Sequence, residues 1–222
     1  MLSDLERDAL AELGNIGIGR ASTALGRMLG GLVTLSVPTV EMVPPDAVAR
    51  LLDRALIPPL VGISETLGGL FSGCALLVFP QAGSLPLVRA ALPPDVAAED
   101  APALEDEVLA ELGNVVLNSA LAQIANLLGE PVETGLPAVF RGGAAEILRG
   151  CSGAVPTVEG VVEGAAVLFH IDLRTSLPRG DGGGDGGNDG GGVGGRVVLL
   201  LDAGSAGTLQ ATLGRYIGRL VA

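Results

Sequence analysis

The sequence predicts an α/β fold built from a helix–strand unit that occurs twice. The stretch EDEVLAELGN at 105–114 nearly repeats ERDALAELGN at 6–15, at an offset of 99 residues. Helix-like and strand-like segments follow both copies in the same order. Hydrophobic residues make up 48% of the chain and aromatic residues only 2%, which predicts an aliphatic core large enough to fold without metal or disulfides.

The repeat extends beyond these ten positions. Identities continue at the same offset through the predicted helix, turn and strand, at Ala21/Ala120, Leu29/Leu128, Gly30/Gly129, Val33/Val132, Pro38/Pro137 and Val40/Val139. Identities at one fixed offset through three kinds of element indicate a duplicated unit. We therefore expect a single domain over 1–222, with internal repeats at 1–99 and 100–222.

Each repeat is predicted to contain a long helix, a strand, a short helix, two strands and a closing helix. The first long helix is predicted at 4–28, because Ser3 and Glu6 form a capping box before it and the pair Gly30-Gly31 follows it. The rest of the first repeat is predicted as a strand at 32–43 with an edge or bulge at Pro38, a short helix at 44–52 and a strand pair at 59–69 and 70–79.

In the second repeat, AAVLFHIDLRT at 165–175 alternates as a half-buried strand does. The alternation predicts that Val167, Phe169, Ile171 and Leu173 face the core, and that His170, Asp172 and Arg174 face solvent. His170 is the only histidine of the chain. We expect it to be a surface residue without a catalytic role.

The second repeat contains a glycine-rich insertion, RGDGGGDGGNDGGGVGG at 179–195. It has almost no apolar residues to compensate its ordering entropy, which predicts a flexible loop between two strands. Calcium binding is a weaker interpretation, because calcium-binding glycine repeats occur in tandem copies and this one stands alone. The RGD tripeptide is interpreted as coincidental.

Charge and cysteine content limit the possible partners. The formal charge of −12 argues against binding to nucleic acid or to anionic membrane surfaces. Cys74 and Cys151 lack the spacing of a metal site and are expected to be buried free thiols. The beginning of the sequence does not resemble a signal peptide and no long uncharged apolar run is present, so a cytoplasmic location without membrane insertion is expected.

The repeated helix is predicted to present one polar face. At 100° per residue, Asp8, Glu12, Asn15 and Gly19 form one narrow stripe. The opposite face is expected to be buried and contains Leu10, Leu13, Gly17, Ala21, Ala24 and Met28. The equivalent stripe of the second repeat contains Glu107, Glu111, Asn114 and Asn118.

Polar side chains on an outer helical face are often simply solvated. Here the Glu and the Asn three residues later occur in both copies, although Asn is a mediocre helix former. Gly14 and Gly113 lie between them, and each costs about 1 kcal/mol relative to Ala inside a helix. Glycine would allow close approach of either a neighbouring helix or a docking partner. Both interpretations remain open at this point.

A carboxylate and an amide without a nucleophile or metal cluster can still orient water. The amide can hold a water in line with an electrophile, and the carboxylate can pair with a lysine of an incoming molecule. Such a site is sufficient if the substrate protein provides its own metal and phosphoryl group. An aspartyl phosphate in a receiver domain does so.

At these residues the sequence resembles the CheC/CheX/FliY family of chemotaxis phosphatases. The family motif is Asp or Ser, then Glu four residues later, then Asn three residues after that. Asp8, Glu12 and Asn15 match it, and Glu111 and Asn114 match it again, with Glu107 in place of the Asp or Ser. Within this family, the sequence resembles the CheC branch most.

The resemblance implies a CheC-like domain of two pseudo-twofold related α/β repeats, with a shared sheet and two long active-site helices. It implies hydrolysis of phosphorylated CheY, in which Glu12 and Glu111 anchor the receiver lysine and Asn15 and Asn114 orient the attacking water. Asp8 and Glu107 would support partner contact. No cofactor of its own is implied, because the Mg²⁺ would belong to CheY, and CheD is implied as a further partner.

Two other functions are considered. One is a non-catalytic adaptor or scaffold of the chemotaxis or flagellar switch system, similar to the FliM middle domain and binding CheD. Retention of both Glu–Asn pairs argues against this, since a scaffold does not need them. The other is an unrelated hydrolase that uses Asp8 and Glu12 as an acid/base pair. Both carboxylates lie on an exposed face, which does not favour it.

Overall fold

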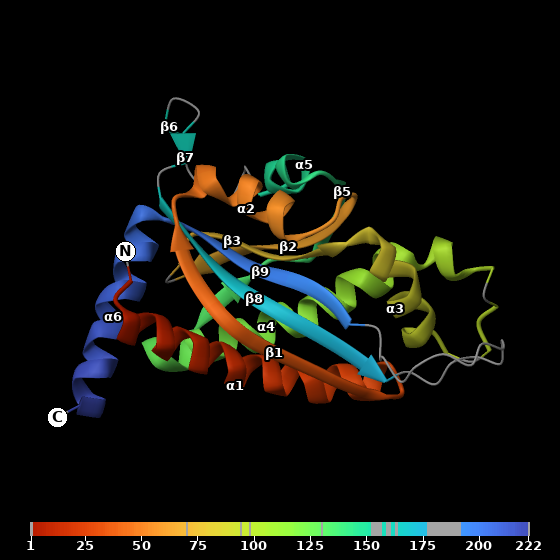
Figure 1. Ribbon diagram of the computed structural model, residues 1–222, viewed down its shortest axis with the longest axis horizontal. Coiled ribbons are helices and arrows are strands. Elements are labelled where there is room, and N and C mark those ends of the chain that lie inside the picture. Colours follow the sequence, from red (N-terminus) through yellow and green to blue (C-terminus); the bar gives the residue numbers. More distant parts are fainter. Residues whose placement is uncertain are drawn as a thin grey trace.

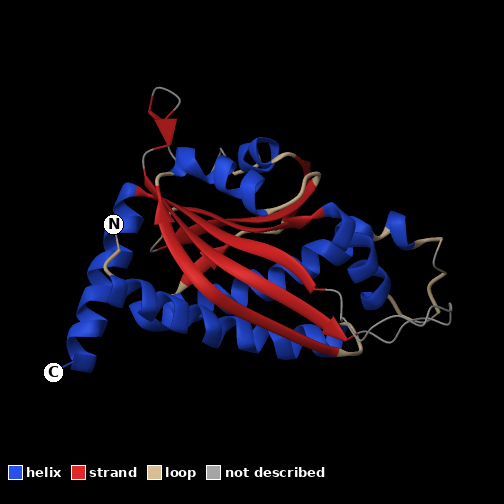
Figure 2. Ribbon diagram, viewed as in Figure 1, coloured by secondary structure: helices blue, strands red, loops and turns tan. Residues whose placement is uncertain are grey.

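The structure, a computed structural model, describes residues 2–69, 71–93, 95–97, 99–129, 131–151, 157–158, 161–162, 164–176 and 192–221. A seven-stranded antiparallel sheet is covered by helices on both faces (Figures 1 and 2). The predicted α/β fold class is therefore confirmed. The α-helices are α1 (Asp4–Met28), α2 (Val48–Ala55), α3 (Ser84–Ala91), α4 (Glu105–Leu128), α5 (Ala144–Arg149) and α6 (Ala203–Val221).

The strands of the main sheet follow the order β1-β8-β9-β3-β2-β4, with β5 also paired to β2. Each edge strand therefore pairs with a strand of the opposite repeat, and the two repeats share one sheet. The bounds of the strands are β1 (Leu32–Val43), β2 (Leu60–Gly69), β3 (Gly73–Pro80), β4 (Val132–Thr134), β5 (Ala138–Gly142), β8 (Gly164–Ser176) and β9 (Gly192–Asp202), while β6 (Thr157–Val158) and β7 (Val161–Val162) form a separate pair.

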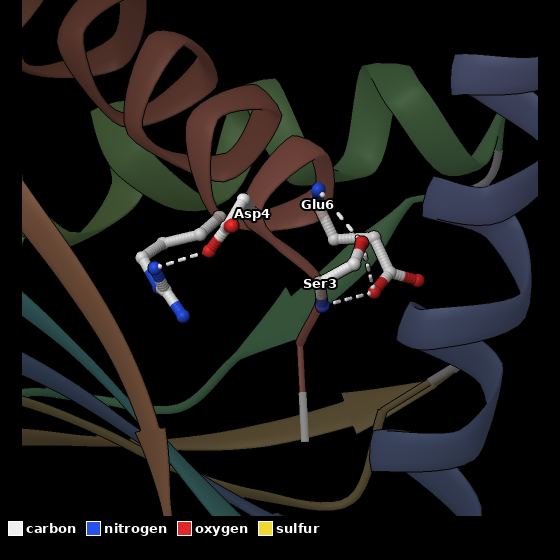
Figure 3. Close-up of polar contacts among 4 residues, drawn as sticks. Ser3, Asp4 and Glu6 are labelled. Carbon is white, nitrogen blue, oxygen red and sulfur yellow. Dashed lines mark hydrogen bonds and ion pairs between the residues drawn. The ribbon is translucent and has the colours of Figure 1, made fainter.

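Helix α1 has the predicted bounds. Ser3 Oγ accepts from Glu6 N–H at 3.3 Å, and Ser3 N–H donates to Glu6 Oε2 at 2.7 Å, which completes the capping box (Figure 3). At the other end Gly30 adopts φ +63°, a left-handed conformation that favours glycine. The chain then enters β1 at Leu32. Local signals thus determine where α1 begins and ends.

Two hydrophobic layers hold the helices on the sheet. The larger one lies under α1 and α4, which are side by side on one face, and extends to α3 and α6 (Figure 1). The smaller one lies under α2 and α5 on the other face. Helix α4 is long and apolar enough to span a membrane by length and composition, but half of that window is buried inside this fold.

The buried face of α1 differs slightly from the prediction. Leu10, Gly17 and Ala21 are buried as expected, and Leu13 and Met28 are half-buried.

Ala24 is exposed, which corrects the prediction for this residue. The reason is that α1 contacts both the sheet and α4. The buried face of α1 therefore includes Gly14, Ile18 and Leu25 and does not include Ala24.

The expectation for His170 also needs correction. Val167, Phe169 and Ile171 are buried in the larger core, as the alternation predicts. His170 points to the opposite face, but its side chain is only 23% exposed, and its Nε2 lies 2.9 Å from a carboxylate oxygen of Glu41. Burial in this setting lowers the pKa of His170, with the Arg196 guanidinium adding to the effect.

The face to which His170 points is covered in part by α2, which alternation within one strand does not reveal. The side chains of Leu173 and Arg174 lie outside the described residues.

The expectation of two free thiols is wrong. Cys74 of β3 and Cys151, which follows α5, form a disulfide with their Cα atoms 5.9 Å apart. Both are buried in the smaller core. They are 77 residues apart in the sequence, so only the packing of α5 on the sheet brings them together.

The predicted glycine-rich loop at 179–195 lies mostly outside the described residues. Its last four residues do not belong to a loop. Gly192 to Gly195 form the first part of β9 and pair with residues 171–174 of β8. These residues are extended because they pair with β8, although glycine is a weak strand former.

Candidate functional site

The first candidate site is a row of polar side chains on α1. Asp8, Glu12 and Asn15 are all exposed, and Gly19 continues the row one turn further. Spacings of three or four residues place them on one helical face. The structure therefore presents these three side chains to a molecule that approaches α1 from solvent.

Asn15 is also hydrogen-bonded to the edge strand β1. Its Oδ1 accepts from Val37 N–H at 2.9 Å, and its Nδ2 donates to Val37 O at 3.3 Å. The pairing of β1 with β8 is interrupted between Ser36 and Thr39, where Pro38 has no N–H to donate. A buried backbone group needs a partner, and Asn15 provides it for Val37. The Asn15 amide is thereby held in one orientation.

The second candidate site is the equivalent row on α4. Glu107 and Glu111 are exposed and Asn114 is half-buried. Asn118 Nδ2 donates to Asn114 Oδ1, and Asn118 Oδ1 in turn accepts from Thr134 Oγ1 of β4 at 3.2 Å. Asn114 is thus fixed by a side chain of its own helix and not by a strand backbone.

The two motif glycines allow α1 and α4 to approach the sheet. A Cβ on Gly14 would lie 3.0 Å from Phe169 Cδ1 of β8, and a Cβ on Gly113 would lie 2.4 Å from Ile63 Cγ2 of β2. The sequence left open whether a neighbouring helix or a docking partner lies against these glycines. Neither is correct for these two positions, because the sheet lies against both glycines.

A third glycine brings the two helices together. A Cβ on Gly17 of α1 would lie 2.6 Å from the backbone oxygen of Ser119 in α4. The close α1–α4 contact therefore depends on glycine at this point. The two candidate sites are carried by neighbouring helices that pack on one face of the same sheet (Figure 1).

The arrangement offers a limited set of chemical functions. Each site has a solvent-facing carboxylate and an amide that is held by hydrogen bonds. Within the described residues, no three His, Cys, Asp or Glu side chains gather as a metal site would require. An exposed carboxylate can pair with a cation, and a fixed amide can both donate to and accept from a water molecule. These functions fit a partner that provides the electrophile.

The sequence did not reveal how the two amides are held. The Val37 backbone was not recognised as a partner of Asn15, because this contact depends on how β1 packs against α1. Asn118 was placed on the polar stripe, and its spacing of four residues from Asn114 is the signal that predicts contact along a helix. Thr134 was missed, since it belongs to another element.

Comparisons with known proteins agree with the resemblance seen in the sequence. The model of the CheC-like family matches residues 5–42, which include Asp8, Glu12 and Asn15. The flagellar motor switch phosphatase FliY of Bacillus subtilis (strain 168) is 28% identical over 141 residues, covering 62% of this chain and 36% of FliY. The CheY-P phosphatase CheC of the same organism is 26% identical over 129 residues, covering 57% of this chain and 61% of CheC.

The match thus spans about a third of FliY and about three fifths of CheC. The fold is similar to the crystal structure of Thermotoga maritima FliY, with a TM-score of 0.66 at 17% identity, covering 97% of this chain and 98% of that structure. The predicted resemblance to the CheC and FliY proteins is confirmed. At this identity the structural similarity establishes the fold alone.

Proposed function

We propose that this chain is a phosphatase that hydrolyses the aspartyl phosphate of a CheY-type receiver protein. One observation carries the proposal. The Glu–x–x–Asn motif occurs on two neighbouring helices, and in each copy the Glu faces solvent while the Asn amide is fixed by hydrogen bonds. The related B. subtilis proteins are named as phosphatases, and one of them as a CheY-P phosphatase.

In the proposed mechanism the receiver provides the reactive group. Its aspartyl phosphate is the electrophile, and its Mg²⁺ neutralises charge on the phosphoryl oxygens. Glu12 or Glu111 pairs with the receiver's lysine and sets the register of docking. Asn15 or Asn114 holds a water in line with the phosphorus atom. The water oxygen bonds to phosphorus as the bond to the aspartate oxygen breaks, which releases inorganic phosphate and a free carboxylate.

Asp8 and Glu107 have a supporting role in this proposal. Each is exposed one turn before the motif Glu on the same helical face. An additional carboxylate there strengthens attraction to basic residues around the receiver's active site and would act mainly on the association rate. Binding to the deamidase CheD and a cytoplasmic location belong to the same proposal, and both derive from the family resemblance.

The test is the decay of a phosphorylated CheY from the same organism. We would compare the wild-type chain with Asn15→Ala, Asn114→Ala and the double variant, and use Asn126→Ala, an exposed Asn further along α4, as a matched control. Each single variant should retain the activity of the remaining site. The double variant should lose about a hundredfold or more of the acceleration, because the attacking water is no longer oriented.

The outcome also separates the proposal from the scaffold alternative. A wild-type chain that binds phosphorylated CheY or CheD without accelerating phosphate loss would support a scaffold and overturn the phosphatase proposal. A double variant as active as the wild type would show that hydrolysis does not use these amides. The Asn126→Ala control should match the wild type in every case.

A further inference from the structure

The second site contains a contact that has no counterpart in the first. Asn118 follows Asn114 by one turn of α4, and its Nδ2 donates to Asn114 Oδ1. Its own Oδ1 accepts from Thr134 Oγ1 at 3.2 Å. These hydrogen bonds form a chain from β4 through Asn118 to Asn114.

We propose that Asn118 is a positioning residue of the second site, held by Thr134. This inference rests on the proposed phosphatase function and assigns a role to a residue outside the Glu–x–x–Asn motif. A primary amide has one accepting oxygen and a donating NH₂ group. The hydrogen bond from Asn118 uses one of the two lone pairs of Asn114 Oδ1 and fixes the amide plane, so that the NH₂ group of Asn114 points in a defined direction and can donate to the attacking water.

The second site needs this support because it lacks the support of the first. Asn15 is held by the backbone of Val37, a residue that is only 2% exposed. The equivalent position in the second repeat is Leu136, which lies in the break between β4 and β5 and is 92% exposed. The segment around Leu136 does not supply Asn114 with the backbone contact that Val37 gives to Asn15.

The first helix in turn has no residue that could act as Asn118 does. The equivalent position on α1 is Gly19, which has no side chain, and a Cβ built there would meet no atom within 4 Å. The two amides are therefore held by different means: Asn15 by the bulge of an edge strand, and Asn114 by a side-chain relay. Asn118 should consequently matter for the second site only.

The role of Asn118 predicts a specific kinetic signature. Without it, the Asn114 amide can rotate, so fewer enzyme–receiver complexes hold the water in line. Glu111, which would anchor the receiver, is not part of the relay. The variant should therefore lower kcat with little change in KM, because misplacement of a reacting group affects the chemical step.

The experiment isolates each site. In an Asn15→Ala background, where only the second site works, Asn118→Ala should lower kcat for decay of phosphorylated CheY about tenfold at unchanged KM. In an Asn114→Ala background, where only the first site works, it should have no effect. Asn126→Ala is the matched control and should be silent in both backgrounds. Equal effects of Asn118→Ala in the two backgrounds, or none in either, would overturn the proposal.

A second variant distinguishes positioning from packing. Asn118→Asp keeps the volume and still accepts from Thr134, but it cannot donate to Asn114 Oδ1 and would attract the Asn114 NH₂ group toward itself. If Asn118 positions Asn114, Asn118→Asp should be at least as impaired as Asn118→Ala. Full activity of Asn118→Asp would show that only the shape of the side chain matters, and would overturn the proposal.

An activity-independent measurement completes the test. The ¹⁵N order parameter of the Asn114 side-chain amide should be high in the wild type and fall in Asn118→Ala, but not in Asn126→Ala. An Asn114 amide that is equally ordered in all three proteins would overturn the positioning role. If the wild type shows no phosphatase activity while the order parameter falls as expected, the proposed function fails and the relay is upheld.

Discussion

The two halves of this protein carry the same motif on different supports. In the first half, β1 runs without a break from Leu32 to Val43, and its bulge at Pro38 leaves the Val37 backbone to bind Asn15. In the second half, the equivalent segment is broken into β4 and β5 around Leu136, and Asn114 is bound by Asn118 instead.

The difference shows which parts of a duplicated motif must be kept and which can change. The Glu and the Asn are the same in both copies, whereas the groups that hold the amide are not. An amide that orients a water must itself be fixed, and different hydrogen bonds can fix it equally well. The first copy couples the amide to the structure of the sheet edge. The second copy couples the amide to the other edge of the sheet only through side chains, from Thr134 of β4 by way of Asn118.

The largest expected difference between the halves lies in the sheet beneath the helices. Ile63 of β2 and Phe169 of β8 are the residues that lie against Gly113 and Gly14. The next residue on the same face of each strand is Glu65 on β2 and Ile171 on β8. Glu65 is 0% exposed and Ile171 is 2% exposed. Neither carboxylate oxygen of Glu65 has a hydrogen-bond partner in the described part of the chain. Burial raises the pKa of Glu65 from 4.5 to about 7.

This raised pKa predicts a stability that depends on pH. Below pH 4.5 the carboxyl is protonated in both the folded and the unfolded state. Between pH 4.5 and about 7 only the unfolded state releases the proton, so the free energy of unfolding falls as pH rises. Above about pH 7 the loss is complete, at about 3 kcal/mol.

Glu65→Gln should remove this pH dependence, because Gln does not titrate. Glu65→Ile should also remove it, and it places on β2 the residue type that β8 has at Ile171. We would measure urea unfolding of the wild type and both variants at pH 5 and pH 8. Relative to the wild type, the free energy of unfolding of each variant should rise by about 2.5 kcal/mol from pH 5 to pH 8, because a small part of the loss has already occurred in the wild type at pH 5. A difference that does not change with pH would show that Glu65 titrates normally.

The motif glycines provide the next largest contrast. A Cβ at residue 113 would overlap Ile63, at 2.4 Å from its Cγ2 and 2.8 Å from its Cβ. Gly113→Ala should therefore lower stability by about 2 kcal/mol, even though alanine favours the helix. At Gly14 the nearest atom is a ring carbon of Phe169 at 3.0 Å, and Gly14→Ala should stay within about 0.5 kcal/mol of the wild type.

Thermal and urea unfolding of these variants would test the contrast. Gly19→Ala is the matched control, because nothing lies within 4 Å of its added Cβ. It should stabilise the protein by about 1 kcal/mol through helix propensity alone. Equal stability of Gly113→Ala and Gly19→Ala would mean that α4 does not lie against Ile63 as described.

The parts of this structure that the sequence predicted are those with local signals. The bounds of α1 follow from Ser3, Glu6 and Gly30, and the polar stripe follows from helical spacing. The order of elements predicted from the duplicated pattern matches the first repeat, whereas the second repeat has two strands, β4 and β5, where one was predicted and contains the additional pair β6 and β7.

The parts that it could not predict depend on contacts between distant segments. Pro137 aligns with Pro38, yet the second edge strand breaks where the first only bulges. The Cys74–Cys151 disulfide and the burial of Glu65 likewise depend on packing across the sheet.

The different supports of Asn15 and Asn114 should also give a small difference in stability. Asn15 bonds to a buried backbone, so Asn15→Ala leaves the N–H and C=O of Val37 without their partner. This should cost about 1 kcal/mol of stability, since water can reach the exposed Asn15 position and replace part of the interaction. Asn114→Ala removes only a side-chain contact and gains helix propensity, so its stability should equal or exceed that of the wild type.

Asn15→Asp separates the two roles of the first amide. Its carboxylate still accepts from Val37 N–H, so part of the stability should return in urea unfolding, while the NH₂ group that donates to Val37 O and could donate to a water is lost. If Asn15→Ala and Asn114→Ala were equally stable, the Val37 contact would contribute nothing to the fold. A stable Asn15→Asp without first-site activity, measured in the Asn114→Ala background, would assign the missing activity to the amide, because the fold around it is intact.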